Sequence, residues 1–354
     1  MNKNPKCPKC NKASVKYGKR NTKLQSIQVY LCKSCNKRFS LSTQLSKTYS
    51  MQIILNSISN YNLGYTLNQT QEKIQRIYNT KIPISTISSW LSQYKDICTF
   101  AKLRKRAIKD YSPKNMLQKQ TLSHIQPYTF KYHKAKLDIL LKENPKFIEL
   151  KDYIEKINSK EFPHHIFTHH QENSKNNRAS NLDFKYLDVK INKKENLSSK
   201  LAKLALNSAK TNKERHQKLQ DFFLINDSTT IATEIPTYLT NWDAAYYKNK
   251  KCFVFPLNSY QTPITGHIDI LQISNSLIYI LDYKPDSHLK QIQDQAIQQL
   301  TIYAMALSKK LNLPLSDFKA AWFDENICYD FFPLHAVYEK QARVEKVKSI
   351  IVGR

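Results

Sequence analysis

Three absences restrict what this 354-residue chain can be. Its first 50 residues contain no Asp or Glu, no run of 18 apolar residues occurs, and no internal repeat is visible. The missing apolar run excludes a membrane-spanning helix, and the N-terminus lacks the apolar segment of a cleavable signal. The missing repeat excludes a solenoid. We therefore expect two or three globular domains, at least one with a sizeable core.

The missing acidic residues are part of a charge asymmetry along the chain. Residues 1–120 carry 23 Lys and Arg against three acidic residues, and the whole chain has a formal net charge of +28. A basic region on an otherwise ordinary globular chain is typical of a protein that binds a polyanion. Membrane surfaces attract basic segments too, but without an apolar span nucleic acid is the better partner. We expect DNA as the partner, no membrane association, and a cytoplasmic location at the nucleoid.

Cysteine is concentrated near the N-terminus. Cys7-Pro-Lys-Cys10 and Cys32-Lys-Ser-Cys35 form two Cys-x-x-Cys knuckles separated by 21 residues. Two knuckles supply the four thiolates of a tetrahedral Zn²⁺ site, and alternating residues between them predict a β-ribbon. We predict a zinc ribbon over residues 1–45, whose zinc is structural because four Cys close the shell. The remaining Cys98, Cys252 and Cys328 are single and lie in apolar segments, which argues against a secreted disulfide framework.

Residues 46–110 are predicted to form a helix-turn-helix DNA-binding domain. Helices are expected over 51–61, 66–78 and 85–94, with Ser85 as the N-cap of the last one. A plain helical hairpin is the alternative to a DNA-binding triplet.

The last of these helices has the composition of a recognition helix. Ile87, Trp90 and Leu91 would pack inward, which leaves short polar residues that suit base-edge contacts in a groove. The predicted DNA-binding residues are Ser85, Thr86, Ser88, Ser89 and Gln93, with Arg104 and Arg106 from the basic stretch that follows.

Residues 111–200 are predicted to be a helical subdomain followed by a polar linker, with no assigned function. Apolar residues recur at helical spacing over 137–157, and residues 171–200 are rich in Asn, Lys and Ser. A group of histidines, His164, His165, His169 and His170, suggests a metal site. Because no Cys or Asp accompanies them, we favour solvated loop histidines.

Residues 201–354 contain the pattern that carries chemistry. Two apolar segments, 266–271 and 280–284, flank a polar turn at 274–276 and predict an antiparallel hairpin. Pairing about this turn sets Asp269 opposite Asp282, and side-chain alternation puts Lys284 on the face of Asp282. Such a group can hold a hard divalent cation while the Lys orients a water. A surface ion pair on a half-buried sheet is the alternative.

Other segments supply four further candidate residues. His216 lies on one helix face with Leu219, Gln220 and Phe223, as a metal ligand that suits Mn²⁺ somewhat better than Mg²⁺ or as a core residue. Glu234, on a strand expected over 230–236, is a third carboxylate or a solvated edge charge. Gln299 and Tyr303 sit four residues apart on a helix expected over about 289–311, where Tyr303 can also serve core packing.

Together these elements resemble the PD-(D/E)XK nuclease superfamily, in the RecB-type branch that includes CRISPR-associated exonucleases. That branch shows Gly-x-Ile-Asp on one strand and Asp-Tyr-Lys on the next, here residues 266–269 and 282–284. A metal-binding His precedes them and a Gln-x-x-x-Tyr helix follows. The resemblance covers roughly residues 205–335 and implies an α/β restriction-endonuclease-like core with a central mixed sheet. Residues 28–39 and the helical triplet resemble the N-termini of insertion-sequence transposases.

The resemblance implies a role for each candidate. Asp269, Asp282, His216 and the Tyr283 carbonyl would hold one or two Mg²⁺ or Mn²⁺ ions, and Glu234 would assist. Lys284 would position the attacking water, Gln299 and Tyr303 would hold Lys284 or the DNA backbone, and hydrolysis would leave a 5′-phosphate. The region lacks the four Cys that hold an iron–sulfur cluster in many relatives.

We therefore predict a multidomain, metal-dependent deoxyribonuclease that its zinc ribbon and helix-turn-helix direct to DNA. One alternative is a non-enzymatic DNA-binding regulator whose nuclease-like core is a scaffold. Another is a mobile-element transposase, although its usual RNase-H-like core needs three widely spaced carboxylates and no adjacent Lys. The oligomeric state stays open, and helix-turn-helix proteins often bind as homodimers.

Overall fold

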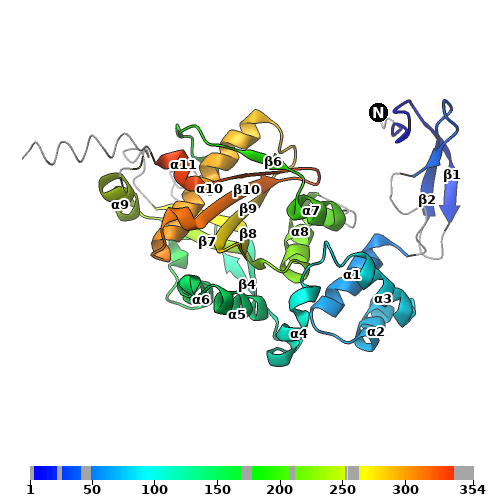
Figure 1. The fold of residues 1–354 in the computed structure, drawn as a ribbon, viewed down its shortest axis with the longest axis horizontal. Coiled ribbons are helices and arrows are strands. Elements are labelled where there is room, and N and C mark those ends of the chain that lie inside the picture. The colour runs from blue at the N-terminus through cyan, green and yellow to red at the C-terminus, as the bar shows by residue number, and fades with distance from the viewer. Residues whose placement is uncertain are drawn as a thin grey trace, which may run out of the picture. The chain divides into compact units, whose positions relative to one another are not determined.

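The computed structural model describes residues 4–21, 26–40, 49–168, 178–206, 212–251, 253 and 263–338 (Figure 1). The chain divides near Tyr94 into two compact units. Cys252, His169 and His170 lie outside the described residues. The expected mixture of helices with a large mixed sheet is confirmed, and the described residues also form a small three-stranded sheet.

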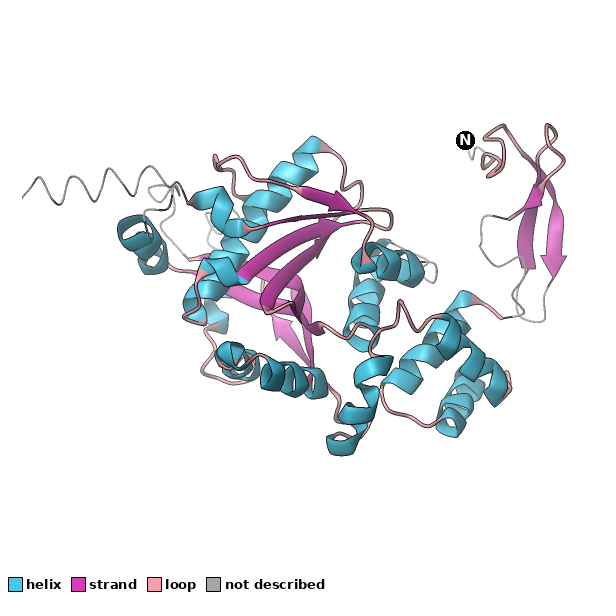
Figure 2. Ribbon diagram, in the orientation of Figure 1, coloured by secondary structure: helices cyan, strands magenta, loops and turns pink. Residues whose placement is uncertain are grey.

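The first unit contains the small antiparallel sheet, in the order β1-β2-β3 (Figure 2). Its strands are Val15–Asn21, Ser26–Leu31 and Arg38–Phe39. The predicted β-ribbon between the two knuckles is confirmed. Its core consists of little besides cysteine, because Cys7, Cys32 and Phe39 are its buried residues. So small a core stabilises a fold weakly, which makes a metal at the Cys residues the natural source of its stability.

The first unit also contains the three predicted helices, α1 (Met51–Asn62), α2 (Leu67–Tyr78) and α3 (Ile84–Gln93). Helix α2 begins with a capping box between Thr66 and Gln69, which satisfies backbone donors at its first turn.

The predicted N-cap of α3 is wrong. The helix begins at Ile84, one residue before Ser85, with Pro83 in the cap position and no side-chain cap hydrogen bond. A proline already has a φ near that of a helix, and Pro83 has a φ of −57°, so the turn starts without a side-chain cap.

The second unit is built around an eight-stranded sheet in the order β4-β5-β7-β8-β9-β10-β11-β6. Strands β9 and β10 are parallel and the other neighbours are antiparallel. The strands are Leu117–Ser123, Pro127–His133, Asn192–Lys194, Thr230–Leu239, Ile264–Ser274, Leu277–Tyr283, Phe318–Phe323 and Cys328–Phe331, for β4 to β11.

Helices pack against this sheet (Figure 1). Helix α10 (Lys290–Lys310) contacts β7, β9 and β10, and α8 (Asn212–Asn226) contacts β5, β7 and β8. The remaining α-helices are α4 (Ala101–Asp110), α5 (Lys134–Glu143), α6 (Glu149–Lys156), α7 (Leu197–Leu206), α9 (Asn241–Lys251) and α11 (Pro333–Val337). Short 3₁₀ turns lie at Pro145–Phe147, His164–Phe167, Ala179–Asn181 and Leu315–Asp317. None of the helices in the described ranges combines the length and apolar composition needed to cross a bilayer.

The predicted separate helical subdomain and linker over 111–200 is wrong. Helices α5 and α6 do form there, but β4, β5 and β6 from the same region are strands of the large sheet. Strand β5 pairs with β7 through Lys131 and Tyr132, so this region is part of the same core as residues 201–338. Helix α4, which the prediction grouped with residues 46–110, also belongs to the second unit.

Candidate functional site

The hairpin that carries the two aspartates has the predicted register. Its turn residues Asn275 and Ser276 have φ values of 50° and 56°, and two left-handed residues in succession match the twist of antiparallel strands. The pairing continues to Ile270 opposite Leu281. One step further in this register, Asp269 faces Asp282.

Three elements bring metal-ligand atoms together beside this hairpin. His216 Nε2 on α8 lies 2.9 Å from Asp269 Oδ2 on β8, and His216 Nδ1 lies 3.8 Å from Glu234 Oε1 on β7. One ligand atom from each of these residues falls within 4.8 Å of the others. We call His216, Glu234 and Asp269 the mixed cluster. Asp282 is outside this group of three, although the sequence placed it among the ligands.

Glu234 is held in an unusual backbone conformation. Its φ of 55° is in the left-handed region, in the middle of strand β7. For a residue other than Gly this conformation costs about 1–3 kcal/mol, and such strain concentrates at functional sites. The carboxylate accepts a hydrogen bond from Gln220 Nε2 at 2.6 Å. These contacts favour the supporting role of Glu234 over a solvated edge charge.

Gln220 is a site residue to which the sequence prediction assigned no role. Its side-chain nitrogen lies 2.6 Å from Glu234 Oε1 and 3.1 Å from His216 Nδ1. The signal was present, because residues four apart on a helix share a face and Gln220 follows His216 by four. Gln220 therefore orients two residues of the mixed cluster at once.

Lys284 points to Asp282, as the alternation predicted. Its Nζ lies 2.7 Å from Asp282 Oδ2 and donates to Gln299 Oε1 at 3.1 Å. Gln299 in turn donates to the Tyr303 hydroxyl at 3.0 Å. The helix α10 thus holds the lysine through a chain of two side chains. Tyr303 is also buried, so its packing and positioning roles coexist.

Contact with Tyr303 explains why the first residue of the Gly-x-Ile-Asp segment is glycine. A Cβ at Gly266 would lie 2.3–2.8 Å from three atoms of the Tyr303 ring. No larger residue fits unless Tyr303 moves, and Tyr303 supports Gln299 and Lys284.

The Tyr283 backbone N–H donates to Asp269 Oδ2 at 3.3 Å. Metal ligation by the Tyr283 carbonyl stays a prediction.

The electrostatics of the site favour a bound cation. Burial, followed by the charge of Asp269, raises the pKa of Glu234 to about 7 and that of Asp282 to about 8. The charge of Asp269 raises the pKa of His216 to about 9. Carboxylates crowded into a buried site thus retain protons that a cation can replace. The oxygen and imidazole donors fit Mg²⁺ or Mn²⁺.

The four N-terminal cysteines form a second cluster, the Cys cluster: Cys7, Cys10, Cys32 and Cys35. Their sulfurs are 3.4–3.5 Å apart in the three closest pairs, far longer than a disulfide and close to the separation in a tetrahedral zinc site. The four atoms can hold a metal such as zinc, as predicted.

The two knuckles are copies of one local design. Both read Cys-x-x-Cys-Asn-Lys, and the two asparagines, Asn11 and Asn36, have φ values of 55° and 50°. In each knuckle the first Cys donates its backbone N–H to the Lys carbonyl, at 2.9 and 3.0 Å. Asparagine tolerates the left-handed conformation, which turns the chain so that both thiols face one point.

The predicted DNA contacts from Ser85 to Gln93 lie on α3, and Arg104 and Arg106 lie on α4 in the second unit. Ser85, Ser88, Ser89 and Gln93 are exposed and Thr86 is half-buried, while Ile87 and Trp90 are buried as expected and Leu91 is half-buried. Arg106 forms an ion pair with Glu143, so a DNA phosphate would have to compete for its guanidinium. DNA binding by these residues stays a prediction.

Of the predicted histidine group, His164 is held by hydrogen bonds to the chain. His164 Nε2 lies 3.1 Å from the Ile157 carbonyl, which only accepts, so His164 Nδ1 must accept from His124 at 3.1 Å. His124 Nδ1 then accepts from His267 at 2.7 Å. Burial, with the charge of His164, lowers the pKa of His124 to about 4, consistent with a neutral His124 ring. His165 is exposed.

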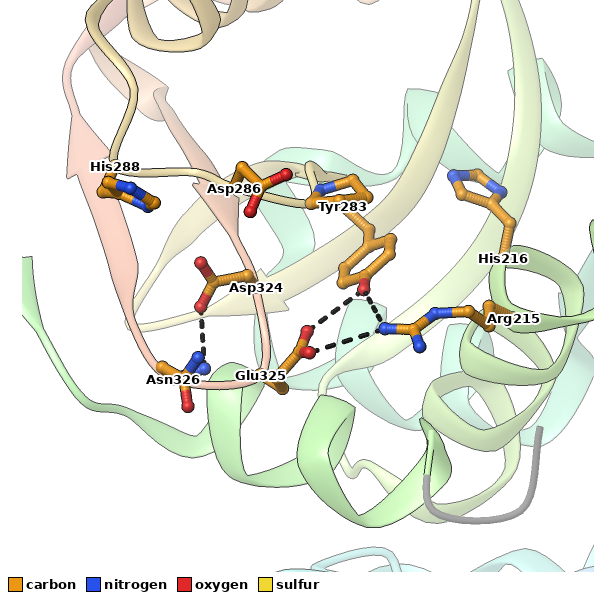
Figure 3. Close-up of a pocket in the computed structure, with 9 residues that line it drawn as sticks. Arg215, His216, Tyr283, Asp286, His288, Asp324, Glu325 and Asn326 are labelled. Atoms are coloured by element: carbon orange, nitrogen blue, oxygen red, sulfur yellow. Dashed lines mark hydrogen bonds and ion pairs between the residues drawn. The ribbon is translucent and has the colours of Figure 1, made fainter. Parts of the chain in front are cut away.

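A pocket of about 440 Å³ opens beside the mixed cluster (Figure 3). Arg215 and His216 reach it from α8, Tyr283 lies at the end of β9, and the β9–α10 and β10–β11 connections supply the rest. Its other lining residues are Tyr283, Pro285, Asp286, His288, Asp324, Glu325 and Asn326.

No protein-family model, curated protein or solved structure matches this chain.

Proposed function

We propose that this protein is a metal-dependent deoxyribonuclease that hydrolyses phosphodiester bonds at the mixed cluster. The observation that carries the proposal is the convergence of His216, Asp269 and Glu234, from three separate elements, beside the paired Asp282 and Lys284. A purely structural ion pair would not require a strained backbone at Glu234 or a half-buried lysine held by Gln299.

His216, Glu234 and Asp269 would hold the metal, with Asp282 as a further carboxylate. A bound Mg²⁺ or Mn²⁺ supplies a nucleophilic water at neutral pH and neutralises phosphate charge. Gln220 orients the ligands of α8 and β7 from behind. The pocket beside them gives a phosphate access to the site.

Lys284 would act as a charged donor. Burial lowers its pKa, but the charge and hydrogen bond of Asp282 together with the charge of Asp269 outweigh burial and raise the pKa above the usual value for lysine. The side chain is therefore an ammonium, which donates hydrogen bonds to the attacking water and to a phosphate oxygen and does not take a proton. Its positive charge stabilises the negative charge that develops on the phosphate. Gln299 and Tyr303 keep this donor in place.

The basic first unit would bring the site to DNA. In this proposal the chain is multidomain: a zinc ribbon and a helix-turn-helix precede a restriction-endonuclease-like core. The Cys cluster would hold structural Zn²⁺, and the exposed polar residues of α3 would contact base edges. Cleavage would leave a 5′-phosphate, and the oligomeric state is a separate question.

Substitution of Lys284→Ala tests the proposal. Plasmid and linear DNA are incubated with the full chain and Mn²⁺, and DNA affinity is measured in parallel by fluorescence anisotropy. We expect cleavage to fall by about a hundredfold or more, as for the loss of one preorganised charged donor, while DNA affinity stays nearly unchanged.

Lys146→Ala is the matched control, because Lys146 pairs with Asp317 at 3.2 Å away from the site and is 44% exposed. It should cleave like the unmodified chain. DNA binding without cleavage by either the unmodified chain or the variants, over a panel of linear, circular, branched and single-stranded DNAs, would favour the non-enzymatic regulator.

A further inference from the structure

We propose that Arg215 is a positioning residue that binds the DNA phosphate next to the scissile one, and that Glu325 occupies its guanidinium until DNA displaces it. This inference deepens the proposed nuclease function and rests on it. It is carried by the contacts of Arg215 in the pocket shown in Figure 3.

Arg215 is held, but weakly, at the wall of this pocket. Its Nη2 donates to the Tyr283 hydroxyl at 3.2 Å and to Glu325 Oε1 at 3.4 Å. Both distances exceed the 2.7–2.9 Å that is typical of a charge-assisted pair. The Arg215 side chain is 34% exposed and that of Glu325 is 37% exposed, so solvent screens the pair and a ligand can reach it.

The guanidinium of Arg215 has N–H groups that these two contacts do not use. Arginine presents five N–H groups in a planar fork, and the contacts found for Arg215 among the described residues use Nη2. A phosphate accepts two parallel N–H groups of such a fork, which is a stronger contact than the single bond to Glu325. An incoming phosphate can therefore replace the carboxylate.

Among the residues that line the pocket, Arg215 is the one Lys or Arg, and three are acidic. The carboxylate of Asp324 is already occupied by backbone N–H groups of Asn326 and Ile327, at 2.7 and 2.9 Å, and by the Ser287 hydroxyl at 2.7 Å. Glu325 is the acid that pairs with Arg215, so it is the one whose place an entering phosphate would take.

The position of Arg215 indicates that it binds the phosphate next to the scissile one. Its partner Tyr283 lies between Asp282 and Lys284 on the chain, and alternation along β9 directs the Tyr283 side chain away from those two. Lys284 and Arg215 therefore act on opposite sides of the end of β9. His216, next to Arg215 on α8, belongs to the mixed cluster, so the two phosphate sites adjoin along a DNA backbone.

The test compares Arg215→Gln, Arg215→Lys and Glu325→Gln with the matched control Lys146→Gln, each as the full chain with Mn²⁺. The substrates are a duplex with a mapped cut and the same duplex with one neutral methylphosphonate next to that cut. We expect Arg215→Gln to raise KM by at least about tenfold, the effect of one charge-assisted hydrogen bond, and to change kcat little.

The methylphosphonate separates a phosphate contact from a structural role. It should lower kcat/KM for the unmodified chain and leave that of Arg215→Gln unchanged. Arg215→Lys should recover part of the lost affinity, and Glu325→Gln should lower KM because the competing charge is gone. The inference is overturned if Arg215→Gln behaves like Lys146→Gln, or keeps its sensitivity to the methylphosphonate. Fluorescence anisotropy with Ca²⁺ measures DNA binding without cleavage. If the duplex is not cut, the nuclease proposal fails, but the effect of Arg215→Gln on phosphate binding can still be measured.

Discussion

The Cys cluster and the mixed cluster show two ways in which one chain assembles metal ligands. The Cys cluster uses four sulfurs from two local turns of identical design, within residues 7–35. The mixed cluster uses a nitrogen and two carboxylates from α8, β7 and β8, which span residues 212–274. Four sulfurs complete a tetrahedral shell, whereas three mixed ligands leave positions for water and substrate. In the proposed function, the locally assembled cluster is structural and the cluster that converges from distant segments is catalytic.

The residues that surround the two clusters differ as well. Beyond its sulfurs, the small core of the Cys cluster contains Phe39 and the half-buried Tyr30. The mixed cluster adjoins the pair of buried Asp282 and half-buried Lys284, a charged pocket and a strained residue, Glu234. Charged groups that are costly to bury are consistent with the proposed metal site, because such groups concentrate at functional sites.

The largest effect should come from breaking the Cys cluster. We expect Cys32→Ser to lose the bound zinc and unfold the ribbon, because structural zinc contributes about 10–16 kcal/mol in small zinc domains. Metal analysis and limited proteolysis within residues 1–45 check this. Mn²⁺ affinity at the mixed cluster should be unaffected; if it falls as well, the two clusters are not independent.

Gly266→Ala tests how closely the mixed cluster depends on packing. The added Cβ would meet the Tyr303 ring at 2.3–2.8 Å, so Tyr303 must move and release Gln299 and Lys284. We expect a loss of about 1–3 kcal/mol in the free energy of unfolding, as for other overpacked cores, and slower cleavage. Chemical denaturation measures the first. Adding Tyr303→Ala should cost less than the sum of the two single changes, and strict additivity would contradict the steric account.

The smallest predicted effect is the pH dependence of Mn²⁺ binding at the mixed cluster. The charge of Asp269 raises the pKa of His216 to about 9, so near neutral pH the ring is protonated, and a metal must displace this proton. Mn²⁺ affinity should therefore rise with pH up to about 9, by at most about tenfold per unit for each proton displaced. Calorimetry on the zinc-loaded chain measures this, and His216→Asn should show a shallower dependence. Affinity that falls with pH would contradict it.

Several elements follow from local sequence and were predictable. The Cys-x-x-Cys spacing predicted the sulfur cluster, and the polar turn at 274–276 predicted the hairpin and its register. The helix expected over 289–311 is found at Lys290–Lys310. In each of these the determining interactions join residues that are close in the chain, so spacing and alternation are sufficient evidence.

Strand pairing over long separations was not predictable in the same way. The sequence predicts a helical subdomain and linker over residues 111–200, yet residues 117–123 and 127–133 form β4 and β5. Strand β5 pairs with β7, about a hundred residues later. An alternation signal was present in Tyr128, Phe130 and Tyr132, but the helical spacing of residues 137–157 dominated the interpretation. A strand is stabilised by its neighbours in the sheet, and the sequence of the strand alone does not identify them.

The amino-acid sequence by itself determined the Cys cluster, the hairpin with Asp269 facing Asp282, and the basic N-terminal region, since each depends on short-range spacing or simple charge. Tertiary structure alone decided that Glu234 and Gln220 share a site with His216, that Gly266 is required by Tyr303, and that Arg215 meets Glu325 across a pocket. The physical reason is that distances, burial and pKa values at a site depend on which distant segments pack together. Those contacts form only once the whole sheet is assembled.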